Sequence, residues 1–250
     1  MGTLKTHAEV SRVRELLQGA KGIFVLTGAG ASAESGIPTF RGADGWWKKF
    51  RAEDLATPQA FSENPGLVWE WYDHRRRLVA EASPNDGHKA LAKIEGSAER
   101  FLLATQNVDD LHERAGNRNV EHVHGSLWRV RCTSCSYAGE LRDVPLPETP
   151  PRCKACRGLL RPDIVWFGET LNLAVVQRID DFLQKLPTLD AALVVGTTAV
   201  FGYIQQWALM AKQSGAAVIE INPQETPLTQ VVDVALRAKS AEVLPQIVDG

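Results

Sequence analysis

Four short apolar runs alternate with helical patterns along this chain, and that alternation restricts the possible folds more than any other feature of the sequence. Each run is bounded by glycine or polar residues, as expected of strands buried on both faces. The runs are 23–27 (IFVLT), 101–105 (FLLAT), 192–196 (ALVVG) and 217–221 (AVIEI). Apolar residues at helical spacing lie before and between them, at 10–17, 88–94, 173–186 and 204–212. We therefore predict an α/β fold with a doubly wound parallel sheet that helices cover on both faces.

All four cysteines lie between the second and third of these runs. They form two pairs, Cys132-x2-Cys135 and Cys153-x2-Cys156, separated by 17 residues. This spacing is typical of a zinc ribbon, in which each CxxC turn presents two thiolates and four thiolates surround one Zn²⁺. The alternative, two disulfides, suits a small secreted domain rather than a chain of this kind. A four-thiolate site leaves no position open, so the metal would hold the module together without taking part in chemistry.

The cysteine region is flanked by the proline-rich segment 144–151 and is most simply a small module inserted into a larger domain. We expect the smaller domain to combine a helical part with this zinc-ribbon module, and the larger domain to be built from three separate segments. The smaller domain would comprise 46–80 and 128–163, and the larger domain 1–45, 81–127 and 164–250.

Charge and hydropathy restrict the possible partners. With 28 basic and 30 acidic side chains the net charge is −2, which gives no basic face for nucleic acid. The N-terminal residues lack the apolar run of a signal peptide, and no segment approaches the roughly 20 apolar residues of a spanning helix. We therefore expect a soluble, cytoplasmic protein with neither a nucleic-acid partner nor a membrane partner.

A glycine-rich turn follows the first apolar run directly, in the segment GAGASAESGIPTFRG at 28–42. Gly28-x-Gly30-x-x-Ala33 fits the dinucleotide fingerprint, in which missing side chains let backbone amides approach a pyrophosphate. About 20 residues later a Rossmann dehydrogenase has a strand that ends in an acidic residue, whereas this chain has two tryptophans and two lysines at 46–49. The body should therefore be Rossmann-like, with a dinucleotide held differently from that of a hydride-transferring enzyme.

Polar side chains follow the other three apolar runs. The carboxyl ends of parallel strands form the ligand crevice of such a sheet, so these groups should lie together in one site. Any one of them alone could equally belong to a turn or a helix cap. The residues are Gln106, Asn107, Asp109, Thr197, Thr198, Asn222 and Gln224.

His124 leads directly into the cysteine module and so should lie at the junction of the two domains. A histidine there could be an ordinary boundary residue. Its imidazole could also accept a proton near pH 7. The spacing of the sequence leaves both readings open.

Three consecutive arginines lie on a predicted amphipathic helix, VWEWYDHRRRLV at 68–79. On a helical wheel Arg75 falls within the apolar face, Arg77 lies opposite, and Arg76 sits at the edge. We expect Arg76 and Arg77 to be solvated. Arg75 needs an anionic partner, which could be a ligand or an acid of the protein, unless it snorkels to the surface.

Seven features follow one another along nearly the whole chain. They are GAGASAESGIPTFRG (28–42), TQNVDDLHERAG (105–116), HGS (124–126), the four cysteines, RPDIVWFGE (161–169), VGTT (195–198) and INPQETP (221–227). Together they resemble the sirtuins, a family of NAD-dependent protein-lysine deacylases. The resemblance implies that nicotinamide leaves NAD, the acyl oxygen of a modified lysine attacks the ribose, and His124 acts as general base on a ribose hydroxyl. The products would be lysine and an O-acyl-ADP-ribose.

The resemblance also implies a role for each site residue. Those implied to act in catalysis are His124, Asn107 and Asp109. Those implied to bind NAD are Gly28, Ala29, Gly30, Ala33, Thr39, Phe40, Arg41, Gln106, Asn107, Asp109, Gly196, Thr197, Thr198, Asn222, Gln224 and Ser240. Those implied to pair with the substrate as an added β-strand are Val165, Trp166, Phe167 and Gly168.

The subgroup that this sequence most resembles adds a specificity. Tyr72 and Arg75 lie three residues apart on the predicted helix and share a face. In that subgroup these positions hold the terminal carboxylate of a succinyl, malonyl or glutaryl group, and a small residue, here Ala56, leaves room for it. A carboxylate in an apolar tunnel needs a cation and a hydroxyl, which an acetyl group does not. We therefore expect a desuccinylase and demalonylase with weaker deacetylase activity.

Two other functions remain open at this stage. An ADP-ribosyltransferase would use the same NAD chemistry on an acceptor side chain. A zinc-ribbon adaptor that senses NAD would need no catalytic base, so His124 would be dispensable.

Overall fold

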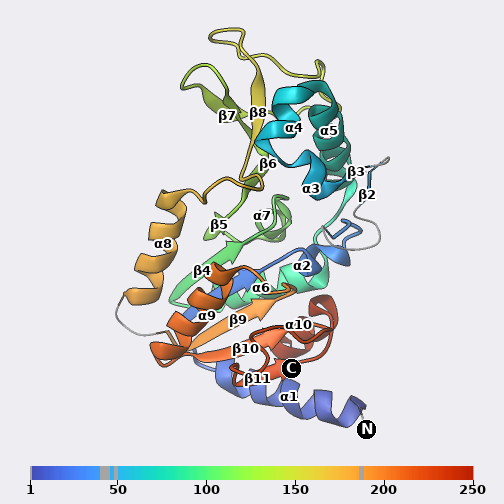
Figure 1. Ribbon diagram of the computed structural model, residues 1–250. Helices are drawn as coiled ribbons and strands as arrows, with labels where there is room; N and C mark the ends of the chain where they lie inside the picture. The colour runs from blue at the N-terminus through green and yellow to red at the C-terminus, as the bar shows by residue number, and fades with distance from the viewer. Residues whose placement is uncertain (1, 40–45, 48–49, 186–188, 250) are drawn as a thin grey trace.

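The computed structural model describes residues 2–39, 46–47, 50–185 and 189–249. A parallel sheet forms the centre of its larger lobe (Figure 1). Its strands are β1 (Gly22–Thr27), β4 (Arg100–Thr105), β5 (Val120–His122), β9 (Ala191–Val195), β10 (Ala217–Ile221) and β11 (Val234–Leu236), in the spatial order β11-β10-β9-β1-β4-β5. All neighbouring pairs are parallel. From β1 the chain winds outward through β4 and β5, then crosses to the other side of β1, so the strand order reverses between β1 and β9. The predicted doubly wound sheet is confirmed.

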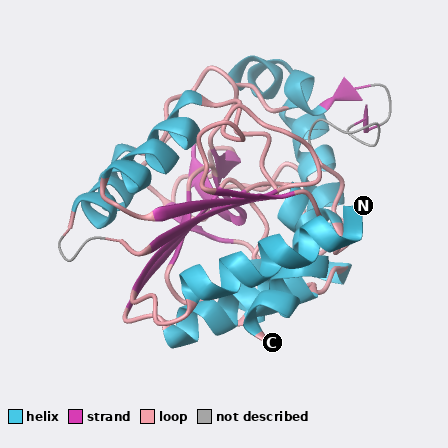
Figure 2. Cartoon of the chain, turned by 90° about the horizontal axis from the view of Figure 1, so that it is seen from below, coloured by secondary structure: helices cyan, strands magenta, loops and turns pink. Residues whose placement is uncertain are grey.

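Helices cover both faces of this sheet (Figure 2). Alternate residues of β1 point to opposite faces, with Ile23 and Val25 in one apolar cluster and Phe24 and Leu26 in the other. The first cluster is closed by α1 (Gly2–Leu17), α6 (Asp86–Ser97) and α10 (Ser240–Val248). The second is closed by α8 (Leu173–Gln184) and α9 (Gly202–Gln213). Within the described parts of the chain, no helix combines the length and the apolar character needed to span a bilayer.

The smaller lobe combines an antiparallel sheet with short helices (Figure 1). The sheet order is β7-β6-β8, with β6 (Gly125–Cys132), β7 (Ala138–Glu140) and β8 (Leu160–Ile164). The helices are α3 (Ala52–Leu55), α4 (Pro58–Glu63) and α5 (Pro65–Glu81), and a two-stranded ribbon, β2 (Trp46–Trp47) and β3 (Phe50–Arg51), precedes them. Thr57 and Asn64 cap α4 and α5 through their side chains, each followed directly by a proline, so both helices begin where the sequence fixes them.

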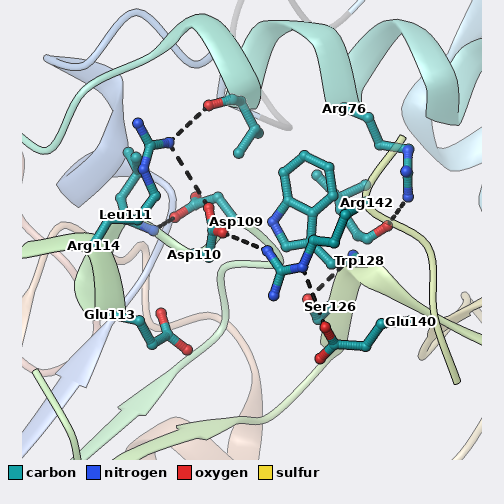
Figure 3. Close-up of polar contacts among 12 residues, drawn as sticks. Arg76, Asp109, Asp110, Leu111, Glu113, Arg114, Ser126, Trp128, Glu140 and Arg142 are labelled. Atoms are coloured by element: carbon teal, nitrogen blue, oxygen red, sulfur yellow. Dashed lines mark hydrogen bonds and ion pairs between the residues drawn. The ribbon is translucent and has the colours of Figure 1, made fainter. Parts of the chain in front are cut away.

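Arg76 corrects the expectation that two of the three arginines on α5 are solvated. Its side chain is fully buried and donates to the carbonyl oxygens of Leu127, Leu141 and Asp143 at 2.8 to 2.9 Å. Its guanidinium also lies over the Trp128 ring, 4.9 Å from the centroid (Figure 3). A helical wheel places Arg76 at the edge of the apolar face but does not show the second sheet that covers that edge. Arg77 does lie at the surface, where it pairs with Asp73.

Candidate functional site

Two loops interlock at the carboxyl edge of the large sheet, at the point where the strand order reverses. Gly30 donates its N–H to the carbonyl of Gly196 at 2.8 Å, and Gly28 donates to Val195 at 3.1 Å. A Cβ on Gly28 or Gly30 would lie 2.8 Å from atoms of the other loop, and Gly196 has φ +59°. Backbone packs directly on backbone here, so each of these positions excludes a side chain. The turn leads into the short helix α2 (Gly30–Ala33).

The polar residues that follow the strands meet across this edge. Gln106 donates from Nε2 to the Thr197 hydroxyl at 2.8 Å. Asn222 donates from Nδ2 to the Thr197 carbonyl at 2.6 Å, and its own Oδ1 accepts from the amide of Gln224. The loops after β4, β9 and β10 are thus joined through Thr197, as their shared position at the carboxyl ends predicts.

A buried cluster lies between the glycine turn and the loop after β4. Ser32 Oγ donates to Asp109 Oδ2 at 3.0 Å and accepts from Asn107 Nδ2 at 3.0 Å. The amide of Leu111 donates to the other oxygen of Asp109 (Figure 3). Burial raises the pKa of Asp109. Asn107 and Asp109 are therefore held rigidly, with their polar atoms fixed by neighbours.

The sequence analysis missed the layer beneath this cluster. Thr27 donates to Thr105 at 2.8 Å, so its hydroxyl oxygen accepts from His112 Nε2 at 3.0 Å. His88 Nε2 lies 3.4 Å from Ser32 Oγ. Burial lowers the pKa of His88 to about 4 and that of His112 well below its usual range. Both imidazoles are therefore neutral at pH 7. The only available signal was that Ser32 and His112 lie inside two of the quoted motifs.

His124 lies directly before β6, with both ring nitrogens engaged. Nδ1 is 3.0 Å from the Gln106 carbonyl oxygen, and Nε2 is 2.6 Å from the hydroxyl of Tyr203. A carbonyl only accepts, so Nδ1 carries the hydrogen and the lone pair of the neutral ring is on Nε2. Burial lowers the pKa of His124, while the Gln106 carbonyl raises it. The side chain is therefore a neutral imidazole with its basic nitrogen defined.

The predicted acyl-binding residues come together in the smaller lobe. Tyr72 is fully buried, and its hydroxyl oxygen accepts from Trp166 Nε1 at 2.8 Å. The guanidinium of Arg75 lies 5.1 Å from the centroid of the Trp71 ring and 5.8 Å from that of Tyr72. Burial lowers the pKa of Arg75, and the charges of Tyr72 and Asp109 raise it. Arg75 and Tyr72 therefore lie together, as their shared helix face predicts.

Val165, Trp166, Phe167 and Gly168 form the turn that follows β8 rather than part of a regular strand. The amide of Val165 donates to the His124 carbonyl, and that of Phe167 donates to the Ala56 carbonyl, both at 2.9 Å. The turn therefore connects three predicted positions: His124, the small residue Ala56, and Tyr72 through the indole of Trp166. The Phe167 side chain is 41% exposed.

The remaining predicted cofactor residues differ in how closely they join the site. Ser240 is buried at the start of α10, and its hydroxyl has no hydrogen-bond partner among the described residues. Ala29 precedes α2, whereas Ala33 and Thr198 are exposed. Thr39 is half-buried just after the glycine turn. Phe40 and Arg41 lie outside the described residues.

The four cysteines converge as the spacing predicts. Their sulfur atoms all lie within 4.8 Å of one another, with Cys132–Cys156 at 3.5 Å and Cys135–Cys153 at 3.8 Å. No disulfide links them. Four thiolates around Zn²⁺ at about 2.3 Å give sulfur–sulfur separations of about 3.8 Å, so the donor set fits that ion. The amide of Ser134 contributes by lowering the pKa of Cys132 to about 7.

Comparison with known proteins gives consistent matches. A sequence model of the Sir2 family matches residues 28–201. An NAD-dependent protein deacylase of Aquifex aeolicus is 49% identical over 227 residues, covering 91% of this chain and 94% of the relative. NAD-dependent protein deacylase 1 of Archaeoglobus fulgidus is 50% identical over 229 residues, 92% of each chain.

Solved structures agree over nearly the full length. A Sir2 homologue in complex with NAD superimposes with a TM-score of 0.89 at 48% identity, covering 96% of this chain and 92% of the other. A complex described as Sir2, p53 peptide and NAD⁺ gives a TM-score of 0.82 at 27% identity, with 94% and 95% covered.

Proposed function

This chain belongs to the Sir2 family, the sirtuins, and from that premise we propose that it removes succinyl and malonyl groups from protein lysines. It is an NAD-dependent protein-lysine deacylase, with NAD and Zn²⁺ as cofactors. Glutaryl groups belong to the same proposed substrate class, and acetyl groups are removed more slowly. The substrate is an acylated protein or peptide.

The residues at the sheet edge suit NAD. At Gly28 and Gly30 the facing loop occupies the place of a side chain, so the carboxyl edge presents backbone there, as a pyrophosphate-binding turn does. The Ser240 hydroxyl, buried without a partner among the described residues, is a polar group that a nucleotide would satisfy. We assign Gly28, Gly30, Thr197, Asn222 and Ser240 to the nucleotide. When bound, NAD supplies a glycosidic carbon that can be transferred to the acyl oxygen.

Asn107, Asp109 and Gln106 orient the ribose in this proposal, because their own side chains are fixed by Ser32, Leu111 and Thr197. His124 accepts a proton from a ribose hydroxyl at Nε2. Its Nδ1–H is held by the Gln106 carbonyl, so the ring cannot present the other nitrogen. Gln106 thus holds the imidazole through its backbone carbonyl and carries the side-chain amide that is proposed to orient the ribose.

The acyl pocket carries the specificity. Tyr72 already accepts a hydrogen bond from Trp166, so its own O–H is available to donate to a ligand. Arg75 supplies the positive charge beside it, with its guanidinium against the rings of Trp71 and Tyr72. A carboxylate gains charge-assisted hydrogen bonds from both, whereas an acetyl methyl group gains neither. The contact between the Arg75 guanidinium and the ring of the fully buried Tyr72 is the observation on which the proposal rests.

The decisive experiment compares acyl groups and arginine variants. Succinyl-, malonyl-, glutaryl- and acetyl-lysine peptides are incubated with NAD, and the products are weighed by mass spectrometry. Arg75→Met should lower kcat/KM for succinyl and malonyl peptides by about 10- to 100-fold, since charge-assisted hydrogen bonds are worth about 1.5–3 kcal/mol, while sparing most acetyl activity. Arg77→Met is the matched control, because Arg77 lies at the surface of the same helix with 53% of its side chain exposed.

Two outcomes would contradict the proposal. Equal losses for acidic and acetyl peptides in Arg75→Met would show that Arg75 does not distinguish acidic acyl groups from acetyl groups. A mass increase of a protein by ADP-ribose, without loss of the acyl group, would indicate ADP-ribosyl transfer instead. His124→Ala should stop every acyl reaction while the folded protein still binds zinc.

A further inference from the structure

Tyr203 makes a contact that the deacylation mechanism does not use. Its hydroxyl lies 2.6 Å from Nε2 of His124, the nitrogen assigned above as the base. Because Nδ1 donates to Gln106, Nε2 has only a lone pair to offer, and Tyr203 must be the donor. The hydrogen bond therefore engages the one electron pair that can accept a proton.

The ring of Tyr203 is held firmly in this position. It is the second residue of α9, stacks on Phe201 with centroids 5.7 Å apart and planes 12° from parallel, and meets the edge of Trp207 at 5.1 Å. Phe201 also meets the His124 ring edge-on at 6.0 Å. The aromatic packing directs the phenol at the imidazole, so the contact follows from the core of the larger lobe.

A neutral imidazole has one lone pair, so it cannot accept at full strength from a phenol and a ribose hydroxyl together. We propose that Tyr203 is a positioning residue that occupies Nε2 of His124 in the resting enzyme and yields it to the ribose hydroxyl. This inference rests on the proposed role of His124 as general base. It adds a residue that controls when the base is available.

The phenol can serve both protonation states of the ring. It donates to Nε2 of the neutral imidazole, and its oxygen can accept from the Nε2–H of the protonated ring. The groups that face the ring are the Tyr203 hydroxyl from α9 and, at Nδ1, the backbone carbonyl of Gln106. Removing the phenol hydroxyl therefore frees the Nε2 lone pair of the neutral ring and removes a competitor for the ribose hydroxyl.

The competition acts on the neutral form of His124. At the plateau of the pH profile the wild type is divided between the phenol-bound and the productive states, whereas Tyr203→Phe is not. Deacylation at the plateau should therefore be faster in the variant than in the wild type.

The first test is the Nε2 resonance of His124, measured by ¹⁵N NMR of the intact enzyme without ligands at a pH where the ring is neutral. Tyr203→Phe keeps the stacked ring and should shift this resonance towards that of a ring nitrogen whose lone pair accepts no hydrogen bond. Tyr137→Phe is the matched control, since Tyr137 lies in the cysteine module against Lys154, and it should leave the resonance unchanged. An unchanged resonance in Tyr203→Phe would overturn the inference.

The second test measures peptide deacylation against pH with both substrates saturating. Tyr203→Phe should exceed the wild type at the plateau by about three- to tenfold, the equivalent of one ordinary hydrogen bond. A plateau below that of the wild type would assign Tyr203 a different role and overturn the inference. Retention of deacylation by His124→Ala would instead overturn the base assignment, so failure of the two proposals can be distinguished.

Discussion

At the scale of single residues, α5 shows how neighbours in sequence acquire different environments. Arg75 lies against the rings of Trp71 and Tyr72, Arg76 is buried on three backbone carbonyls, and Arg77 pairs with Asp73 at the surface. Successive residues on a helix are rotated by about 100°, so each guanidinium meets a different element. Acyl selectivity thus depends in our proposal on Arg75, and Arg77 provides an internal control on the same helix.

Replacing Trp166 tests whether its indole orients the hydroxyl of Tyr72. Trp166→Phe keeps a ring beneath the guanidinium of Arg161 but removes the indole N–H that donates a hydrogen bond to the Tyr72 hydroxyl oxygen. The Tyr72 hydroxyl can then rotate away from a ligand, so kcat/KM for succinyl peptides should fall about three- to tenfold more than for acetyl peptides. Trp69→Phe, which removes the N–H bonded to the Leu160 carbonyl, should affect both substrates equally. If Trp166→Phe lost the same activity on succinyl and acetyl peptides, as is expected for Trp69→Phe, this role of Trp166 would be contradicted.

His88, which lies beside Ser32 in the buried cluster, should make the stability of the protein depend on pH. Its pKa is about 4 in the folded protein against an ordinary value of 6.5, because it is buried. Below pH 6.5 the unfolded chain therefore binds a proton that the folded chain does not, and stability falls as the pH drops towards 4. The loss should reach about 3 kcal/mol over that window. His88→Gln should flatten the dependence of the unfolding free energy on pH, measured with urea between pH 7 and 4.5; an unaltered slope would contradict the assignment.

At the scale of elements, the metal module and α5 are connected. Arg76 donates to the carbonyls of Leu141 and Asp143, in the segment between the two cysteine pairs. Arg142 extends the connection by pairing with Asp110 and lying over the Trp128 ring (Figure 3). The position of Tyr72 and Arg75 therefore depends on a loop that the thiolate cluster holds.

Removing zinc should therefore also change the stability of residues outside the cysteine module. Chelation under mildly denaturing conditions should unfold 132–156, because metal binding is part of the folding free energy of such a module. Amide hydrogen exchange should rise there and in 65–81, while the parallel sheet stays protected. Loss of zinc with unchanged exchange in 65–81 would show that α5 does not depend on the module.

At the scale of the whole molecule, the active edge lies where the two halves of the large sheet meet. The loops after β1 and β9 come from opposite winding directions and interlock through glycines. The ligand crevice of a doubly wound sheet opens at this point. The close packing of backbone on backbone at these glycines also joins the two halves of the domain.

Gly196→Ala should lower both the stability of the domain and its affinity for NAD. Its Cβ would lie 2.4 Å from the Ala31 amide nitrogen, and φ is +59°. The substitution should cost about 1–3 kcal/mol of stability and weaken NAD binding. Gly96→Ala is the control, because nothing lies within 4 Å of its Cβ in helix α6, and it should stabilise by about 0.5–1 kcal/mol. Thermal unfolding and calorimetric titration with NAD would measure both; similar behaviour of the two variants would contradict the prediction.

The sequence predicts the long buried elements and misses the short ones. β1, β4, β9 and β10 agree with the four apolar runs to within one residue at each end, since continuous apolar runs are a strong signal. β5 and β11 have three residues each and carry no periodicity that local reading can detect. The antiparallel sheet β7-β6-β8 depends on pairing between distant segments, which a single sequence does not show.

The site was predictable where a motif marked it. The four cysteines, and the contacts of Gln106, Thr197 and Asn222, follow from spacing and from position at the carboxyl ends of strands. Tyr203 could not be predicted, because α9 brings it to His124 from 79 residues away. Burial of Arg76 was likewise hidden, since it requires knowledge of the covering sheet.

The turn after β8 is fastened to the carbonyl of His124, to the carbonyl of Ala56 and to the hydroxyl of Tyr72. These three hydrogen bonds tie the backbone of the proposed base to the hydroxyl of the proposed acyl-binding pair through one short turn. If Arg75 binds the acyl carboxylate as we propose, an acyl chain of unsuitable length cannot reach both the ribose and the guanidinium.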